Sequence, residues 1–153
     1  MILRREAVVK VPKTIDPATA APLLCAGVTV FNALRQANLP AGELVVVQGL
    51  GGLGHLAVQY AHKLGFKVAV VSSSAGKEAF AKELGASYYI DQSKENAAEI
   101  LQTLGGAAGV LATAPNPEII GALVGGLQPR GKIVILARKS LSSLQLRWKL
   151  TGR

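Results

Sequence analysis

The regular alternation of apolar runs with helical segments is the feature that most constrains the fold of this chain. Runs rich in β-branched, aromatic and small apolar residues occupy positions 44–48, 67–72, 87–90, 108–114 and 131–137. Segments with helical spacing lie between them, and Gly65 and Gly85 end two of these segments. Short strands that alternate with helices are typical of βαβ units, whose parallel strands are covered by helices on both faces. Because such crossovers are right-handed, the sequence predicts a doubly wound, mostly parallel sheet in a three-layer αβα domain.

The two ends of the chain lie outside this alternation. Residues 1–13 predict a short strand closed by Pro12, and residues 138–153 are ambiguous but allow one more helix. Residues 14–42 predict a mostly buried helix, with Asp16 or Thr14 as its cap, Pro17 in its first turn and an end near "NLPAG". A length of 153 residues is that of a single domain.

The segment "GLGGLG", residues 49–54, carries the clearest functional pattern. Its G-x-G-x-x-G spacing falls between an apolar run and a helical segment. There Gly49 permits a tight turn, Gly51 lets the backbone approach a diphosphate, and Gly54 allows close packing of helix on strand. The helix N-terminus offers N–H groups and a partial positive charge to the phosphates. The pattern predicts a dinucleotide site; the alternative is a glycine-rich turn without a ligand.

An acidic residue is missing where a site that prefers NAD usually has one, about 20 residues after the loop. The second run ends in Ser72, Ser73 and Ser74, with Lys77 one turn later, and the first acidic residue after the loop is Glu78. Hydroxyls and an ammonium can bind a 2′-phosphate that a carboxylate would repel. The sequence therefore predicts a preference for NADP(H) over NAD(H). The serines also suit a polar loop that caps the next helix, and both interpretations can hold together.

Charge and composition narrow the partners of the chain. The formal net charge is +8, but the basic residues are scattered and aromatic residues are only 5%, so we expect attraction of small anionic ligands and no nucleic-acid partner. No apolar run approaches the ~18–20 residues of a membrane helix, so we expect no membrane partner. The first ten residues lack the apolar stretch of a secretory signal. The single cysteine, Cys25, excludes an intrachain disulfide, and we expect a cytoplasmic protein.

Four longer segments resemble a known family. They are "VPKTIDPATAAPLLCAGVTVFNAL", "GLGGLGHLAVQYAHKLG", "VVSSSAGKEAFAKELGA" and "LQPRGKIVILA". In this order they resemble the cofactor domain of zinc-dependent medium-chain alcohol dehydrogenases, with a closer likeness to the cinnamyl-alcohol-dehydrogenase-like branch. The resemblance implies a Rossmann NAD(P)-binding fold in an oxidoreductase. It also implies hydride transfer between a nicotinamide and an alcohol or aldehyde, beside a catalytic zinc.

The resemblance also implies roles for single residues. It places Thr29 near the nicotinamide, residues 49–53 at the diphosphate, and the serines with Lys77 at the adenosine 2′-substituent. The end of the fourth apolar run, Thr113 and Ala114, would lie along the cofactor groove, and the end of the fifth, Leu136 and Ala137, near the nicotinamide end of that groove. Together with the patterns above, it gives these candidate cofactor residues: Thr29, Gly49, Gly51, Gly52, Leu53, Gly54, Ser72, Ser73, Ser74, Lys77, Thr113, Ala114, Leu136 and Ala137.

The sequence differs from this family in its zinc ligands. Cys25 matches one zinc-ligand position, but the domain that carries the other ligands has no counterpart here, so no catalytic set is complete and no zinc is expected. His55 and His62 share a helix face, but we expect the sheet to separate that helix from Cys25 and the histidines to be structural. Cys25 then acts as a small buried hydrophobe.

These departures predict a fragment, which is an excised cofactor domain, a truncated gene product or a defective relative. Residues 1–13 would be the last strand of the lost catalytic domain, and residues 14–153 the dinucleotide-binding domain. Such a chain would bind cofactor without turnover, and its uncovered face would favour self-association. The alternatives are a free-standing nucleotide-binding or sensor module and a fragment of a zinc-independent, quinone-type reductase.

Overall fold

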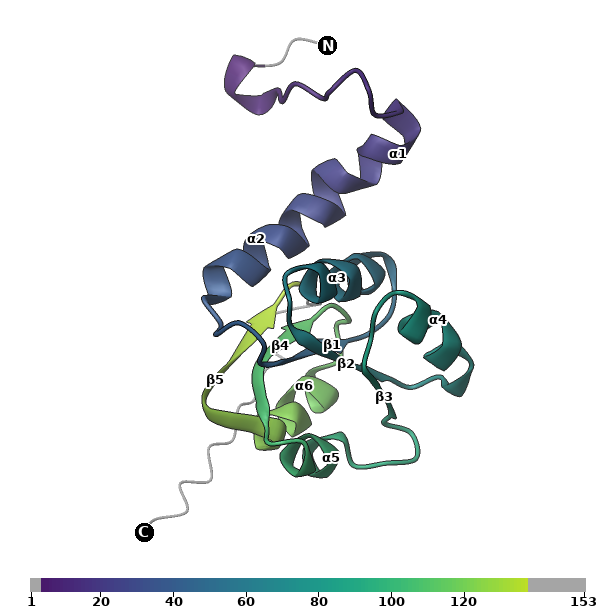
Figure 1. Ribbon diagram of the computed structural model, residues 1–153, viewed down its shortest axis with the longest axis vertical. Helices are drawn as coiled ribbons and strands as arrows, with labels where there is room; N and C mark the ends of the chain where they lie inside the picture. The colour runs from purple at the N-terminus through teal and green to yellow at the C-terminus, as the bar shows by residue number, and fades with distance from the viewer. Residues whose placement is uncertain (1–3, 138–153) are drawn as a thin grey trace.

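A single parallel sheet forms the centre of the molecule (Figure 1). The computed structural model describes residues 4–137, which contain five strands in the order β3-β2-β1-β4-β5. Every neighbouring pair is parallel, so the predicted doubly wound sheet is confirmed. The strands are β1 (Leu44–Gln48), β2 (Lys67–Ser72), β3 (Tyr88–Asp91), β4 (Ala107–Ala112) and β5 (Leu127–Ile135).

Helices cover both faces of this sheet, as the alternation predicts (Figure 1). Helices α2 (Val28–Ala37), α3 (Gly52–Lys63) and α4 (Glu78–Glu83) contribute to the core on one face. Helices α5 (Ala97–Thr103) and α6 (Pro117–Leu123) contribute to the core on the other. Short helical turns at Ala75–Lys77 and Val124–Gly126 complete the connections.

Strand β1 supplies side chains to both cores. Val45 and Val47 lie in the core beneath α3, while Leu44 and Val46 lie in the core beneath α5 and α6. Side chains alternate between the faces of a strand, so Leu44 to Val47 of this central strand are buried on both faces and are all apolar. This burial explains the unbroken apolar run that the sequence shows at this strand.

The cofactor crevice of such a fold lies where neighbouring strands send their helices to opposite faces. Strands β1 and β4 are neighbours here, and they are followed by α3 and α6 respectively, which pack on opposite faces. The carboxyl ends of β1 and β4 therefore bound this crevice. The glycine loop follows β1 directly and lies at its mouth.

The helical segment at residues 17–37 has three parts: α1 (Pro17–Pro22), a π-helical turn (Leu23–Gly27) and α2. Asp16 caps it, because its carboxylate accepts a hydrogen bond from the Thr19 N–H at 3.0 Å, and Pro17 follows as predicted. At its other end Lys132 Nζ donates to the Ala37 carbonyl at 2.6 Å. This bond ties α2 to β5.

The expectation that this helix is mostly buried was wrong. One stripe, including Val30 and Leu34, is buried, but Leu24 and Val28 are 52% and 55% exposed. The helix meets the domain along this stripe and extends past the sheet (Figure 1), so its other faces have no cover within residues 4–137.

The same helix has the length and average composition of a membrane span, although no uninterrupted apolar run of that length occurs in it. Pro17–Ala37 has 21 residues and a mean hydropathy of 1.4, which meets that criterion. Scattered polar residues hide this property in the sequence, because they interrupt the apolar run without lowering its average much. A helix packed on a folded domain meets the same criterion.

The strand expected at residues 1–13 is also absent from the part of it that the structure describes. Arg5–Ala7 form a 3₁₀ turn, and residues 8–13 form no strand. A strand needs a partner edge, and no strand of the described sheet pairs with this segment. The helix considered for residues 138–153 lies outside the described residues.

Candidate functional site

The glycine loop after β1 is held by one left-handed residue and one very close contact. Gly49 has φ +91°, a conformation that favours glycine, and its N–H donates to the Val71 carbonyl at 2.9 Å. A Cβ at Gly54 would stand 2.0 Å from the Gly49 carbonyl oxygen. Helix α3 thus starts directly against the turn that ends β1, and only glycine permits this at position 54.

The other two glycines of the loop face open space. A Cβ at Gly51 or Gly52 would meet no heavy atom within 4 Å, so the fold itself does not require glycine there. Helix α3 begins at Gly52, and its N-cap residue Gly51 has no side chain to cap the first turn. No side-chain cap bonds the N–H groups of this turn, which leaves them able to bind an anion.

A polar clamp joins the ends of β1 and β4 beneath the loop. Thr113 Oγ1 lies 2.9 Å from the Gln48 carbonyl oxygen and 3.0 Å from that of Gly49, and donates between them. The Ala114 N–H donates to Gln48 Oε1 at 3.3 Å. Gln48 is only 2% exposed. The sequence analysis missed it, although a polar residue that ends an otherwise apolar central strand was the available signal.

The serine loop, residues 72–77, lies beside the glycine loop. Ser72 ends β2 and is buried, whereas Ser73 and Ser74 are exposed. Lys77 Nζ lies 3.4 Å from the Leu50 carbonyl oxygen, a long hydrogen bond that places the ammonium between the two loops. The structure therefore brings together the expected diphosphate and 2′-substituent positions.

A pocket of about 430 Å³ opens beyond Ser73, between the first turns of α5 and α6. Gln92 lines it, and its Oε1 is buried without a hydrogen-bond donor among the described residues. Ile119 and Ala122 line the other side. The pocket thus has both apolar and polar lining residues, with Glu95 and Glu118 among the polar ones, and the buried Gln92 Oε1 is not open to it.

Asp91 lies at the end of β3, opposite Ser72 in the strand register, but its carboxylate serves the following turn. Its Oδ1 accepts from the Ser93 hydroxyl at 2.6 Å and the Ser93 N–H at 3.1 Å. The hydrogen bond from the Ser93 hydroxyl is the largest cause that holds the pKa of Asp91 below its ordinary value. Burial of Asp91 acts in the opposite direction, and the nearby Lys94 lowers the pKa further.

A second groove, of about 840 Å³, lies between α2 and β5. Thr29 and Leu136 both line it, together with Asn32 and Val134. The N–H groups of Leu136 and Ala137 donate to the Ala112 carbonyl at 2.9 and 3.3 Å, which extends the pairing past the end of β5. Thr29 and Leu136, both expected near the nicotinamide, thus share one groove, whereas Ala137 and Cys25 are not among its lining residues.

The metal position is correspondingly incomplete. Cys25 is exposed, and no three His, Cys, Asp or Glu residues within 4–137 group as metal ligands. One thiolate does not fit a catalytic zinc, which takes three protein ligands. The expectation of a buried Cys25 was wrong, because the helix presents it away from the domain.

The sheet also does not separate α3 from the helix that carries Cys25. Both lie on one face, where a Cβ at Gly27 would stand 3.0 Å from Tyr60 Oη. Right-handed crossovers fix the face of α3, but α2 precedes the first strand and no crossover rule constrains it. His55 Nδ1 lies 3.2 Å from the Gly51 carbonyl oxygen, and His62 packs against Gly85.

A parallel sheet in this order, with a glycine loop at the switch point, defines a Rossmann-type α/β domain. Residues 52–149 match the family model described as zinc-binding dehydrogenase. The chain belongs to that family, and the matched region includes residues 52–54 of the glycine loop, the serine loop and the clamp residue Thr113.

Known proteins agree with this assignment. The chain is 55% identical over 137 residues to the alcohol dehydrogenase patD of Aspergillus clavatus, covering 90% of this chain and 35% of that protein. It is 48% identical to the alcohol dehydrogenase notN of an Aspergillus species, covering 94% and 42%. A quinone oxidoreductase structure from Pseudomonas syringae has a TM-score of 0.78 and 30% identity, covering 89% and 45%. The chain thus spans less than half the length of these proteins.

We predict that Gly54→Ala lowers the free energy of unfolding by at least about 2 kcal/mol, because the new methyl group collides with the Gly49 carbonyl. Gly121→Ala is the matched control, since Gly121 lies within α6 and has open space around its Cβ position. It should leave stability unchanged or raise it by up to about 1 kcal/mol. Urea denaturation followed by circular dichroism measures both, and equal stability of the two variants would contradict the packing described.

We predict that Asp91→Asn lowers the melting temperature at neutral pH but not in acid. Because the folded-state pKa of Asp91 is lowered, its ionised form stabilises the fold at neutral pH, and this contribution is lost as the pH falls below 3.8 toward the folded-state pKa. Thermal melts between pH 7 and pH 2 test this. In a Ser93→Ala background the effect of Asp91→Asn should be smaller; an undiminished, pH-independent effect would exclude the proposed cause.

Proposed function

We propose that this chain binds NADP(H) in preference to NAD(H), as the cofactor-binding part of an alcohol or aldehyde oxidoreductase. The observation that carries the proposal is the open, uncapped first turn of α3 beside a loop that offers hydroxyls and an ammonium. Exposed main-chain N–H groups at a helix N-terminus suit a diphosphate. Lys77 and the exposed hydroxyls of Ser73 and Ser74 suit a phosphate on the adjoining ribose.

The two grooves extend this site in opposite directions. The pocket beyond Ser73 has Ile119, Ala122 and Leu123 in its lining, and this apolar surface suits the flat face of an aromatic base. The groove at Thr29 and Leu136 lies toward β5, at the other side of the switch point, where the nicotinamide would lie. An extended dinucleotide across the glycine loop would reach both.

When bound, the nicotinamide supplies hydride transfer. The residues of this chain would bind and orient it: the glycine loop the diphosphate, the serine loop the ribose, and the α2–β5 groove the reacting ring. Within residues 4–137 no three His, Cys, Asp or Glu side chains group as metal ligands, so this part of the chain does not supply the three ligands of a catalytic zinc. We therefore expect cofactor binding without alcohol turnover by this chain alone.

A quinone-type reductase is the second candidate. The Pseudomonas quinone oxidoreductase supports it, and so does a quinone oxidoreductase of Thermus thermophilus that was solved in complex with NADPH, with 28% identity and a TM-score of 0.74. Oxidation of NADPH by a quinone in the presence of this chain would favour this candidate. Binding without such turnover favours the alcohol dehydrogenase type or a free-standing nucleotide-binding module.

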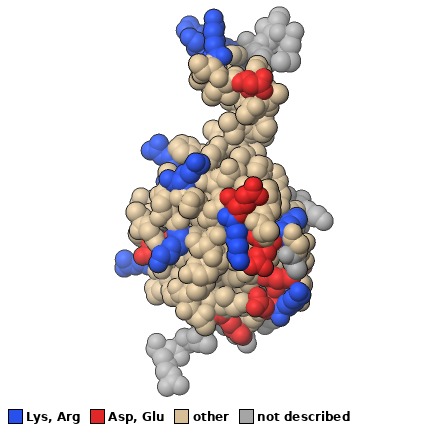
Figure 2. Space-filling model, turned by 45° about the vertical axis from the view of Figure 1, so that its right-hand side comes forward, with Lys and Arg blue, Asp and Glu red and all other residues tan. Residues whose placement is uncertain are grey.

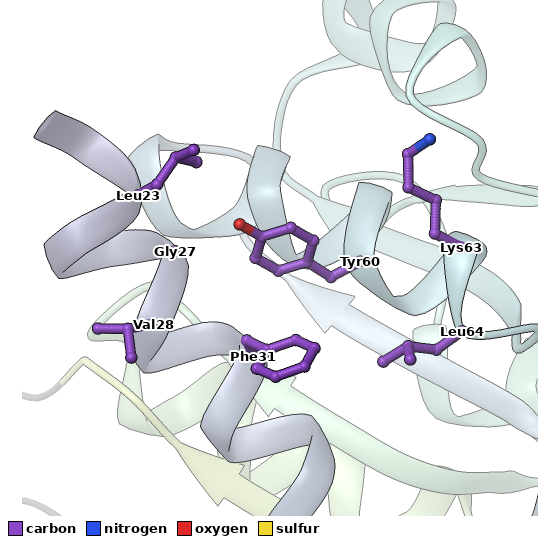
Figure 3. A pocket seen from close by; sticks show the side chains of 7 residues that line it. All are labelled: Leu23, Gly27, Val28, Phe31, Tyr60, Lys63 and Leu64. Carbon is purple, nitrogen blue, oxygen red and sulfur yellow. The ribbon is translucent and has the colours of Figure 1, made fainter. Parts of the chain in front are cut away.

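We further infer that the exposed face of the α1–α2 helix supports self-association. Figure 3 shows a pocket between this helix and α3, where Phe31 and Tyr60 point toward each other. Their rings meet edge to face, with centroids 6.0 Å apart. Val28, Phe31 and Leu64 line the pocket and are 40–55% exposed. Exposed contiguous apolar surface favours association.

The scattered charge supports a small anionic ligand over a nucleic acid. On the face shown in Figure 2, the blue side chains are separated by other residues, apart from those on the N-terminal arm. No continuous basic stripe crosses this face, such as a phosphate backbone would need.

We predict that Ser73→Asp shifts the preference from NADPH toward NADH, raising the Kd for NADPH about tenfold or more, because a carboxylate repels the 2′-phosphate and accepts from a free 2′-hydroxyl. Ser87→Asp is the matched control. Ser87 is exposed and precedes β3, at the amino edge of the sheet, so it should change neither affinity. Fluorescence titration with both nucleotides measures this. An unchanged ratio in Ser73→Asp would remove the argument from the serines.

We predict that Val28→Glu weakens self-association about tenfold or more, because it places a charge on the apolar surface. Ala79→Glu adds the same charge at an exposed position of α4 and serves as the control. Sedimentation velocity over a range of concentrations compares both with the unmodified chain. An unmodified chain that stays monomeric at the highest concentration would contradict the inference. Equal weakening of self-association in the two variants would also contradict it.

A further inference from the structure

Strand β3 supports the serine loop from the side. The Gln92 N–H, just after β3, donates to the Ser72 carbonyl at 3.0 Å. The Tyr89 hydroxyl, within β3, donates to the Ser74 carbonyl. That carbonyl also accepts from the Lys77 N–H at 3.2 Å, which closes the turn between them. The loop is thus held at two carbonyls by the neighbouring strand.

Tyr89 is a rigid support for this bond. It pairs with Val70 in the strand register, and its half-buried ring packs against the core beneath α3 and α4. Its neighbour Tyr88 lies on the opposite face of the sheet, because side chains alternate along a strand, and it is 38% exposed. Two adjacent tyrosines therefore differ in one respect that matters here: only Tyr89 faces the serine loop.

We propose that Tyr89 is a positioning residue that sets the discrimination between NADPH and NADH. The proposal rests on the proposed function of the site. Tyr89 does not need to touch the nucleotide, because it fixes the Ser74 carbonyl. That carbonyl lies in the same turn as the Ser73 and Ser74 hydroxyls and the start of the Lys77 side chain. In the proposed complex these groups meet the adenosine ribose, and the ammonium and hydroxyls bind its 2′-phosphate more strongly than a 2′-hydroxyl.

The consequence is a selective effect. The diphosphate is bound by the main chain of residues 49–54, which is ordered by Gly49, Gly54 and the Thr113 clamp and not by Tyr89. A loop released from Tyr89 would hold its hydroxyls and ammonium less firmly, which weakens binding of a phosphate more than that of a hydroxyl. NADPH affinity should therefore fall while NADH affinity remains.

The test is Tyr89→Phe, which keeps the ring and removes the hydroxyl. Titration should show a Kd for NADPH raised about three- to tenfold, the value of one hydrogen bond, and a Kd for NADH changed by less than about twofold. Tyr88→Phe, the control on the same strand, should change neither. In a Lys77→Met background, Tyr89→Phe should have a smaller effect, because the phosphate partner that it positions is gone. A thermal melt confirms that each variant is folded.

Equal weakening of both nucleotides by Tyr89→Phe, or no change in a chain that prefers NADPH, would overturn the positioning role and leave the proposed function intact. An unmodified chain that binds neither nucleotide, or that prefers NADH, would instead overturn the proposed function, and the role of Tyr89 with it. The two failures are therefore distinguished by the unmodified chain alone.

Discussion

The contact between Gly54 and the Gly49 carbonyl is the constraint on which the site depends. Helix α3 begins so close to the end of β1 that no Cβ fits between Gly54 and the Gly49 carbonyl. The first turn of α3 is therefore brought to the carboxyl edge of the sheet, where no side chain caps its N–H groups. Gly49 turns the chain, Gly54 admits the helix, and Thr113 joins the turn to β4. No side chain is needed to bind an anion at that point, since the main chain already presents the donors.

The rest of the site follows from strand order. Strands β2 and β4 flank β1, so the serine loop and the Thr113–Ala114 segment lie on either side of the glycine loop. Two kinds of group therefore suit two different parts of a dinucleotide. Main-chain donors, fixed by glycines, suit the diphosphate that every dinucleotide shares, whereas side chains on a separately supported loop suit the sugar substituent that differs. Membership of the zinc-binding dehydrogenase family is consistent with this division, because the matched region, residues 52–149, takes in the start of α3 and the serine loop.

The sheet and the glycine loop could be predicted from the sequence because local signals determine them. Apolar periodicity gives the strands, right-handed crossovers give their order, and the glycine spacing gives the turn. The exposure of Val28 could not be predicted, because a helix that lies before the first strand has no crossover to fix its packing. The clamp by Gln48 and the bond from Tyr89 to Ser74 join residues far apart or on different elements, and no spacing rule reports such pairs. The cofactor roles of the residues remain predictions that the positions support.

The most direct test of the central claim is an amide-resolved NMR titration of the folded chain with NADPH. The account predicts saturable shifts that are largest for the N–H groups of residues 50–54, with a second group at residues 72–77 and a third around Thr29 and Leu136, and little change around Tyr60 and Leu64. Absence of binding by the folded chain, or shifts centred on the pocket between α2 and α3, would contradict it.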